Sequence, residues 1–227
     1  MPRRHRPVIE GIPLHIIQRG NNRLACFHTE SDYLIYLYML GEALVLAGCK
    51  LHAYVLMSNH VHLLLTPTRA NSAAALMKSV GERYVQYFNR QHKRTGTLWE
   101  GRYKSCLVQD DGYLLVCHRY IEMNPVRAKM VRSPVEYRWS SFKRNAHGHD
   151  SMLIEPHPLY SSLGNSEADC QQAYRKLFDA DMSEEDLRTM RNALNGNSVF
   201  GSDEFAKSME TAWGRNILPK KQGIYTN

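Results

Sequence analysis

Apolar residues in the first half of the chain form short runs of strand character. Three runs, at residues 12–18, 51–57 and 60–66, are rich in β-branched and other apolar side chains. Only Ser58 and Asn59 separate the second run from the third, which predicts a hairpin or a tightly bent pair. A fourth strand is predicted within residues 97–109.

Helical repeats lie between these strands. Leucines recur at helical spacing between Thr29, which forms a capping box with Asp32, and Gly48, which ends the helix. A second helix is predicted over residues 71–95 and a third over residues 110–124, before a proline. The order β, α, β, β, α, β, α predicts an α+β fold of ferredoxin-like type, an antiparallel sheet with packed helices and one added helix.

The charge of the chain divides it into two parts. The net charge is +7 at pH 7. Residues 1–144 contain 21 basic and 10 acidic residues, whereas residues 145–227 contain 8 basic and 12 acidic ones. The basic part favours a polyanionic partner such as nucleic acid. We therefore predict one domain over residues 1–148, with a basic N-terminal arm, and a small helical extension over residues 149–227.

The extension contains two predicted helices joined by a short linker. Ser183 and Ser202 begin these helices, and Gly196 and Gly214 end them. Each helix has an apolar stripe to bury. The pair fits either a packed accessory module or a helix-turn-helix, with residues 214–223 as a basic tail that reaches DNA phosphates. The acidic first helix favours the packed module.

Cysteine content and hydropathy indicate a cytoplasmic protein. The five cysteines include no C-x-x-C pair, which argues against a disulfide framework and against a zinc ribbon. No run approaches the roughly 18 apolar residues of a membrane span, and no apolar signal segment follows the basic N-terminus. We expect no membrane partner.

Two histidines stand one residue apart at the start of the third predicted strand. In an extended strand His60 and His62 share one face, close enough to approach one ion. Such a pair is more often two ordinary strand histidines than a metal site. The pair alone therefore leaves both interpretations open.

The third predicted helix supplies further polar groups. Tyr120 and Asn124 are four residues apart and so lie on one helical face. The Asn124 amide oxygen would complete a His, His, Asn ligand set with open positions, which suits Mg²⁺ or Mn²⁺ better than a closed zinc site. Each residue also has an ordinary explanation, because Asn124 precedes a helix-stopping proline and Tyr120 is one of 13 tyrosines.

Together these segments resemble a known family. The strand motif HVH at residues 60–62, preceded by AYVLMSN, and the later helical YIEMNPV resemble the single-tyrosine HUH transposases of the IS200/IS605 type, most closely the REP-associated tyrosine transposases. The resemblance also covers HIIQRGNNR, DYLIYL, RTGTLWEGRYKS and YRWSS, and so spans nearly all of residues 11–145. The acidic extension departs from the minimal family domain.

The resemblance implies an enzyme and its site residues. It implies that Tyr120 is the nucleophile and that His60, His62 and Asn124 hold a divalent ion, Mg²⁺ or Mn²⁺. The implied activity is the cleavage and joining of single-stranded DNA through a 5′-phosphotyrosine, on imperfect palindromes that fold as REP-like hairpins. The phenol must lose its proton, and the sequence does not identify the base. A monomer or a homodimer is expected.

Basic and aromatic side chains are candidates for DNA contact. Tyr87, Phe88 or Trp99 could stack unpaired bases. The candidate phosphate contacts are all basic: Arg3, Arg4, Arg6, Arg19, Arg23, Arg83, Arg90, Lys93, Arg94, Arg102 and Lys104. Solvated arginines and core aromatics are the ordinary alternative for each of them.

Two other functions stay open at this point. A non-catalytic DNA-hairpin-binding protein derived from a transposase would bind DNA without cutting it. A plain metal-dependent phosphoesterase would use water as the nucleophile and would leave no phosphate on the protein. If a tyrosine other than Tyr120 attacks, Tyr113 and Tyr103 are the next candidates.

Overall fold

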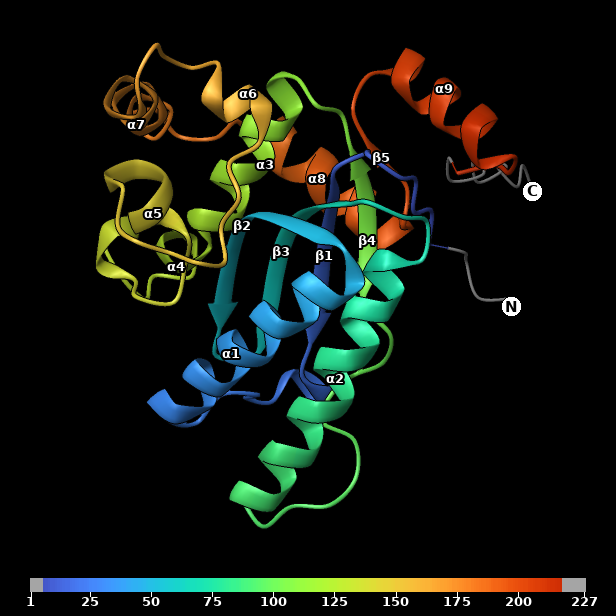
Figure 1. Cartoon of the computed structure of the whole chain (residues 1–227), viewed down its shortest axis with the longest axis vertical. Coiled ribbons are helices and arrows are strands. Elements are labelled where there is room, and N and C mark those ends of the chain that lie inside the picture. Colours follow the sequence, from blue (N-terminus) through green and yellow to red (C-terminus); the bar gives the residue numbers. More distant parts are fainter. Residues whose placement is uncertain (1–5, 218–227) are drawn as a thin grey trace, which may run out of the picture.

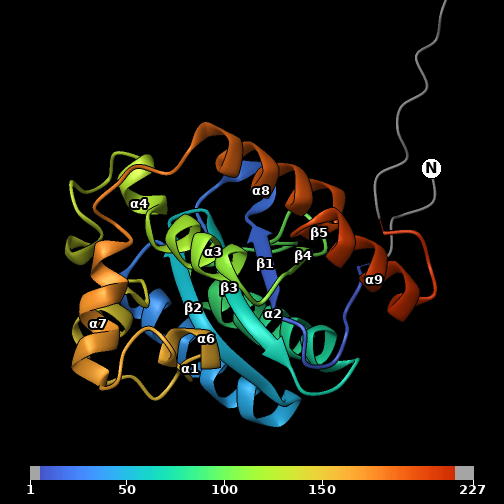
Figure 2. The same cartoon turned by 90° about the horizontal axis from the view of Figure 1, so that it is seen from above.

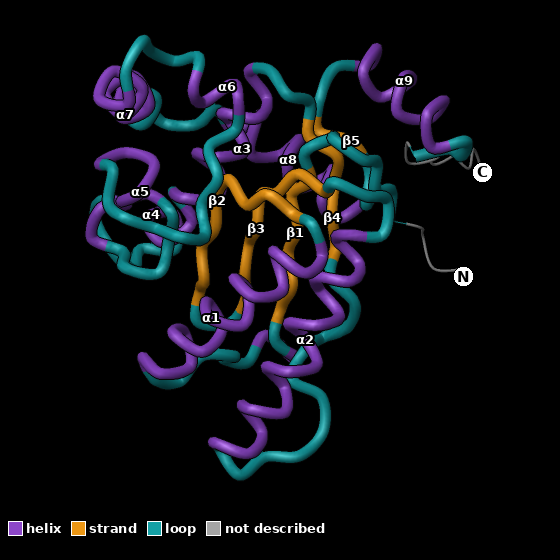
Figure 3. Tube along the Cα trace, viewed as in Figure 1, coloured by secondary structure: helices purple, strands orange, loops and turns teal. Residues whose placement is uncertain are grey.

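A five-stranded sheet forms the centre of the computed structural model, which describes residues 6–217 (Figure 1). Its strands are β1 (Leu14–Arg19), β2 (Cys49–Met57), β3 (His60–Pro67), β4 (Lys104–Val108) and β5 (Val199–Phe200). The strand order is β2-β3-β1-β4-β5 (Figure 3). Neighbouring strands pair antiparallel, except that β4 and β5 pair parallel. The first four strands confirm the predicted ferredoxin-like α+β fold, and β5 was not predicted.

Helices cover both faces of the sheet, as Figure 2 shows. Helices α1 (Glu30–Ala47) and α2 (Ser72–Gln91) pack on one face, and α3 (Gly112–Glu122) and α8 (Glu184–Gly196) pack on the other. The predicted capping box begins α1, and Gly48 ends it with φ at +68°. The remaining helical segments are η1 (Asn21–Arg23), α4 (Asn124–Arg127), η2 (Pro134–Glu136), α5 (Phe142–His147), α6 (Pro158–Ser161), α7 (Glu167–Lys176) and α9 (Asp203–Trp213).

The fourth strand is shorter than the predicted range of residues 97–109. Trp99 pairs with Gly20, and Lys104 pairs with Ile17. Two residues of β1 therefore face the four residues 100–103, and this longer segment loops out of the ladder. Residues of this loop line two separate pockets.

The C-terminal residues are built into the sheet and its core. Strand β5 extends the sheet beside β4, where the sequence predicted only a linker between two helices. Met190 of α8 is buried with α3, whereas Met209 of α9 is buried in the core on the α1 and α2 side. These contacts favour a packed module over a helix-turn-helix. The division at residue 148 stays a prediction, and the basic tail lies outside the described residues from position 218 onward.

A buried carboxyl ties α3 to the C-terminal helices. Glu122, at the end of α3, is fully buried and accepts hydrogen bonds from Ser141, from Asn145 of α5 at 2.9 Å and from Tyr174 of α7 at 2.7 Å. Burial raises the pKa of Glu122 to about 7, although these hydrogen bonds oppose the shift.

In residues 6–217, no helix has both the length and the hydropathy to cross a bilayer.

We expect Glu122→Gln to reduce the pH dependence of folding stability. A carboxyl with a raised folded-state pKa favours folding while protonated, and this stabilisation is lost as the pH rises from about 4.5 through 7. The amide has no such proton, so over this interval the wild type should lose about 3 kcal/mol more than the variant. Urea unfolding at several pH values measures the difference. Equal losses would contradict the buried-carboxyl account.

Candidate active site

Two strands place three histidines on the sheet face beneath α3 and α8. His60 and His62 share that face of β3 because residues two apart on a strand point the same way. Their ring centroids are 5.0 Å apart. His15 lies on the same face of the neighbouring β1, and its ring centroid is 5.0 Å from that of His62. The structure therefore brings the predicted pair together with a third ring that the sequence interpretation missed.

Both predicted metal-ligand histidines use Nδ1 for a hydrogen bond. His60 Nδ1 lies 2.6 Å from Asn59 Oδ1, and His62 Nδ1 lies 2.8 Å from His15 Nε2. No hydrogen bond within residues 6–217 uses Nε2 of either ring. Metal-binding histidines commonly have this arrangement, in which one nitrogen is fixed by a neighbour and the other faces the ion.

Met190 determines the direction of the hydrogen bond between His15 and His62. Its Sδ atom in α8 lies 3.4 Å from His15 Nδ1, and a thioether can only accept. The favoured tautomer of His15 therefore carries its proton on Nδ1 and accepts at Nε2. His62 must then donate from Nδ1, which leaves a lone pair on His62 Nε2.

Burial keeps these rings neutral. It lowers the pKa of His15 to about 3 and that of His60 to about 4, and it holds the pKa of His62 well below its ordinary value. The positive charges of Arg19 and Arg127 act in the same direction. Neutral imidazoles are the form that binds metal ions.

Tyr120 lies against the histidines from α3. Its ring centroid is 5.9 Å from that of His62 and 5.7 Å from that of His15. The guanidinium of Arg127 lies over the ring at 4.5 Å and donates to the Tyr120 carbonyl at 2.6 Å. Burial raises the pKa of the Tyr120 phenol, whereas the charges of Arg127 and Arg191 lower it.

The sequence predicted that Asn124 belongs to the same helix as Tyr120. In the structure α3 ends before it, and after a break at Met123 Asn124 begins the short helix α4. Its Nδ2 donates to the carbonyl oxygens of Tyr120 at 3.0 Å and Ile121 at 3.3 Å. This leaves Oδ1 as the atom that can bind an ion. Among the described residues no group of three His, Cys, Asp or Glu could hold a metal. The role of Asn124 as a third ligand beside the two histidines stays a prediction.

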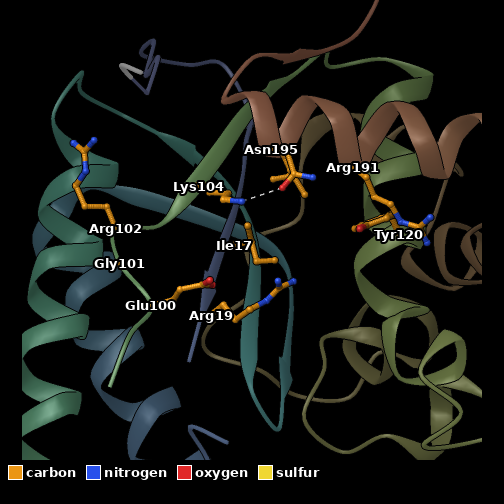
Figure 4. Close-up of a pocket in the computed structure, with 10 residues that line it drawn as sticks. Ile17, Arg19, Glu100, Gly101, Arg102, Lys104, Tyr120, Arg191 and Asn195 are labelled. Carbon is orange, nitrogen blue, oxygen red and sulfur yellow. Dashed lines mark hydrogen bonds between the residues drawn. The ribbon is translucent and has the colours of Figure 1, made fainter. Parts of the chain in front are cut away.

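A cationic pocket of about 350 Å³ opens beside Tyr120 (Figure 4). Three predicted DNA contacts, Arg19, Arg102 and Lys104, line it with Tyr120. Helix α8 adds Arg191, which lies beside Tyr120, and Asn195, whose Oδ1 accepts from Lys104 Nζ at 3.0 Å. These charges suit a phosphodiester next to the phenol.

The other predicted DNA contacts lie apart from this pocket. Arg6 packs over the Tyr103 ring at 4.0 Å, Arg83 pairs with Glu42, and Arg94 packs over Phe88 at 5.4 Å. Phe88 is fully buried, so the prediction that it stacks bases is wrong. Arg23, Arg90 and Lys93 are exposed, and Arg3 and Arg4 lie outside the described residues.

The chain matches the model of the family "Transposase IS200 like" over residues 9–124. A solved REP-associated tyrosine transposase bound to a REP hairpin is similar in fold, with a TM-score of 0.53 and 16% identity over 69% of this chain and 93% of that chain. A solved protein of Deinococcus radiodurans, described as a transposase, is 24% identical over 53% of this chain and 95% of its own, with a TM-score of 0.37. No curated protein matches the chain.

We expect Arg191→Gln to raise the pKa of the Tyr120 phenol. Removing the Arg191 charge removes one of the two cations that oppose the effect of burial. Titration of the tyrosine ring carbons by NMR, with the Tyr120 signal assigned from Tyr120→Phe, measures the shift. Arg188→Gln on the same helix is the matched control, because Arg188 does not line the pocket. Equal pKa values in both variants would contradict the proximity of Arg191.

Proposed function

Because the chain belongs to the IS200-like transposase family, which its match over residues 9–124 establishes, we propose that it is a metal-dependent enzyme that cuts and joins single-stranded DNA. Family and fold agree with the resemblance predicted from the sequence. The observation that supports the proposal best is the position of Tyr120, in ring contact with His62 and on the wall of the cationic pocket.

Tyr120 supplies the attacking oxygen in this proposal. Its phenol oxygen bonds to phosphorus while the bond from phosphorus to the 3′-oxygen breaks. The phenol gives up its proton, and the leaving 3′-oxygen takes one up. The products are a 5′-phosphotyrosine and a free 3′-hydroxyl, which can attack the linkage in turn and rejoin the strand without ATP.

The surrounding residues position the phosphate and favour the phenolate. Arg127 and Arg191 stabilise the ionised phenol by their charge. Arg19, Lys104 and Arg191 line the pocket in which the phosphate binds. A bound Mg²⁺ or Mn²⁺, held by His60 Nε2, His62 Nε2 and Asn124 Oδ1, would neutralise charge on the phosphate oxygens.

The substrate we propose is single-stranded DNA that folds as a hairpin. A backbone that tyrosine attacks in line must be accessible and flexible, which a full duplex is not. The similar solved transposase is bound to a REP hairpin. We propose that this chain recognises an imperfect palindrome of the same kind.

Tyr120→Phe should abolish the covalent protein–DNA adduct and leave hairpin binding nearly unchanged, because only the attacking oxygen is removed. The adduct is measured with end-labelled hairpin DNA after boiling in detergent, and the same sequence as full duplex should stay uncut. Tyr113→Phe is the matched control on α3, since Tyr113 packs on Phe200. If the wild-type protein cleaves the hairpin without forming an adduct, water is the nucleophile. If the wild-type protein binds the hairpin without cleaving it, the protein is non-catalytic.

His60→Ala should weaken Mn²⁺ binding at least ~10-fold, because it removes one of few protein ligands. His60 is only partly buried, so the folded state should survive the change. Calorimetry with Mn²⁺ in the Tyr120→Phe background measures the affinity without cleavage. His149→Ala, at an exposed position, is the control. Unchanged Mn²⁺ affinity, or full cleavage in EDTA, would rule out the metal site.

A further inference from the structure

A second pocket, of about 520 Å³, lies on the opposite face of the sheet from Tyr120. Its walls come from α2, from the end of β1 and from the loop that precedes β4. The loop separates the two pockets, and Arg102 lines both. The cleavage reaction described above uses no residue that lines the second pocket alone.

Two buried polar atoms at this pocket have no partner. Gln18 Oε1 and Trp99 Nε1 find no hydrogen bond within residues 6–217. Gln18 is 8% exposed and Trp99 is 7% exposed. Leaving a buried acceptor and a buried donor unsatisfied is unfavourable, so a ligand that supplied both partners would gain binding free energy here.

Gly81 leaves space above these two side chains. It lies in the middle of α2, where glycine destabilises a helix relative to alanine. A Cβ atom at this position would meet Trp99 Nε1 at 3.8 Å and Gln18 Nε2 at 4.0 Å, which are ordinary contacts. Packing within the chain therefore does not require a glycine here. Its absent side chain leaves a space the size of a methyl group next to the indole N–H and the Gln18 amide nitrogen.

The other walls suit the face of a base and its phosphates. The Tyr103 ring lines the pocket, and the Arg6 guanidinium lies 4.0 Å from its centre. Arg6, Lys78 and Arg102 supply positive charge at the rim, with Glu82 as the one acidic group. Aromatic rings stack on bases of any sequence, and a glutamine amide can pair with a base edge through one acceptor and one donor.

We propose that this pocket binds one unpaired nucleobase of the DNA strand whose phosphate lies at Tyr120. The inference rests on the proposed function for the identity of the strand. Arg102 connects the two pockets, so a strand that crosses the loop at residues 100–103 reaches both. The base hydrogen bonds to Gln18 Oε1 and Trp99 Nε1, and the pocket adds base selectivity to a site that otherwise contacts phosphates.

An abasic scan tests the proposal. Hairpin DNA with single-stranded flanks is made with one abasic nucleotide at each flank position in turn, and binding to the Tyr120→Phe protein is measured by fluorescence anisotropy. One position should weaken binding about tenfold when its base is removed. In the Gly81→Ala protein with Tyr120→Phe, the same position should have little effect, because a methyl group fills the space that the base needs.

Gly81→Ala is suited to this test because it should not impair folding. The added methyl group meets no atom closer than 3.8 Å, and alanine favours the helix. Ser79→Ala, on the same helix and outside the pocket, is the control and should keep the abasic effect. The proposal would be overturned if no abasic position changed the affinity for the hairpin. It would also be overturned if Gly81→Ala left the effect of the sensitive position unchanged.

Two further arms separate the remaining explanations. Deoxynucleoside monophosphates alone should not compete with the hairpin, and competition at the hairpin's own affinity would overturn the proposal in favour of a free-nucleotide site.

Adduct formation is measured separately with Tyr120 intact. If no adduct forms, the proposed cleavage fails, while the position-dependent abasic effect and its loss in Gly81→Ala still decide whether the pocket holds a base.

Discussion

A hydrogen bond of 2.8 Å joins His15 and His62 inside the protein, where burial makes a charge on either ring unfavourable. Because both rings stay neutral, one nitrogen must donate and the other must accept. Met190 Sδ, on the far side of His15, accepts from Nδ1 and so selects the direction. Three elements, β3, β1 and α8, thereby fix which nitrogen of His62 presents a free lone pair.

The same constraint links the C-terminal residues to the chemistry. The family match ends at Asn124. Yet two residues of α8 reach the site, since Met190 contacts His15 and Arg191 contacts the Tyr120 phenol. Helix α3, which carries Tyr120, is fixed at its end by the buried Glu122 and its partners in α5 and α7. Residues after position 148 therefore shape the site itself, in addition to any contact that they make with DNA.

Local patterns in the sequence predicted the parts of the site that one element determines. The spacing of His60 and His62 sufficed to place both on one strand face, and the capping box at Thr29 located the start of α1. His15 could have been noticed as a polar residue within an apolar strand, but its pairing with His62 depends on the register between β1 and β3. Arg191 is 71 positions from Tyr120 in the sequence, and only tertiary packing brings them together. Strand β5 has two residues, too few for a periodic pattern.

The protonation of the His62 ring is the most direct measure of this account. Long-range proton–nitrogen correlation NMR of ¹⁵N-labelled protein at neutral pH distinguishes the two ring nitrogens by their chemical shifts. The account predicts a neutral His62 with the proton on Nδ1 and a free lone pair on Nε2, and a neutral His15 with the proton on Nδ1. A proton on His62 Nε2, in either the neutral or the charged ring, would contradict it.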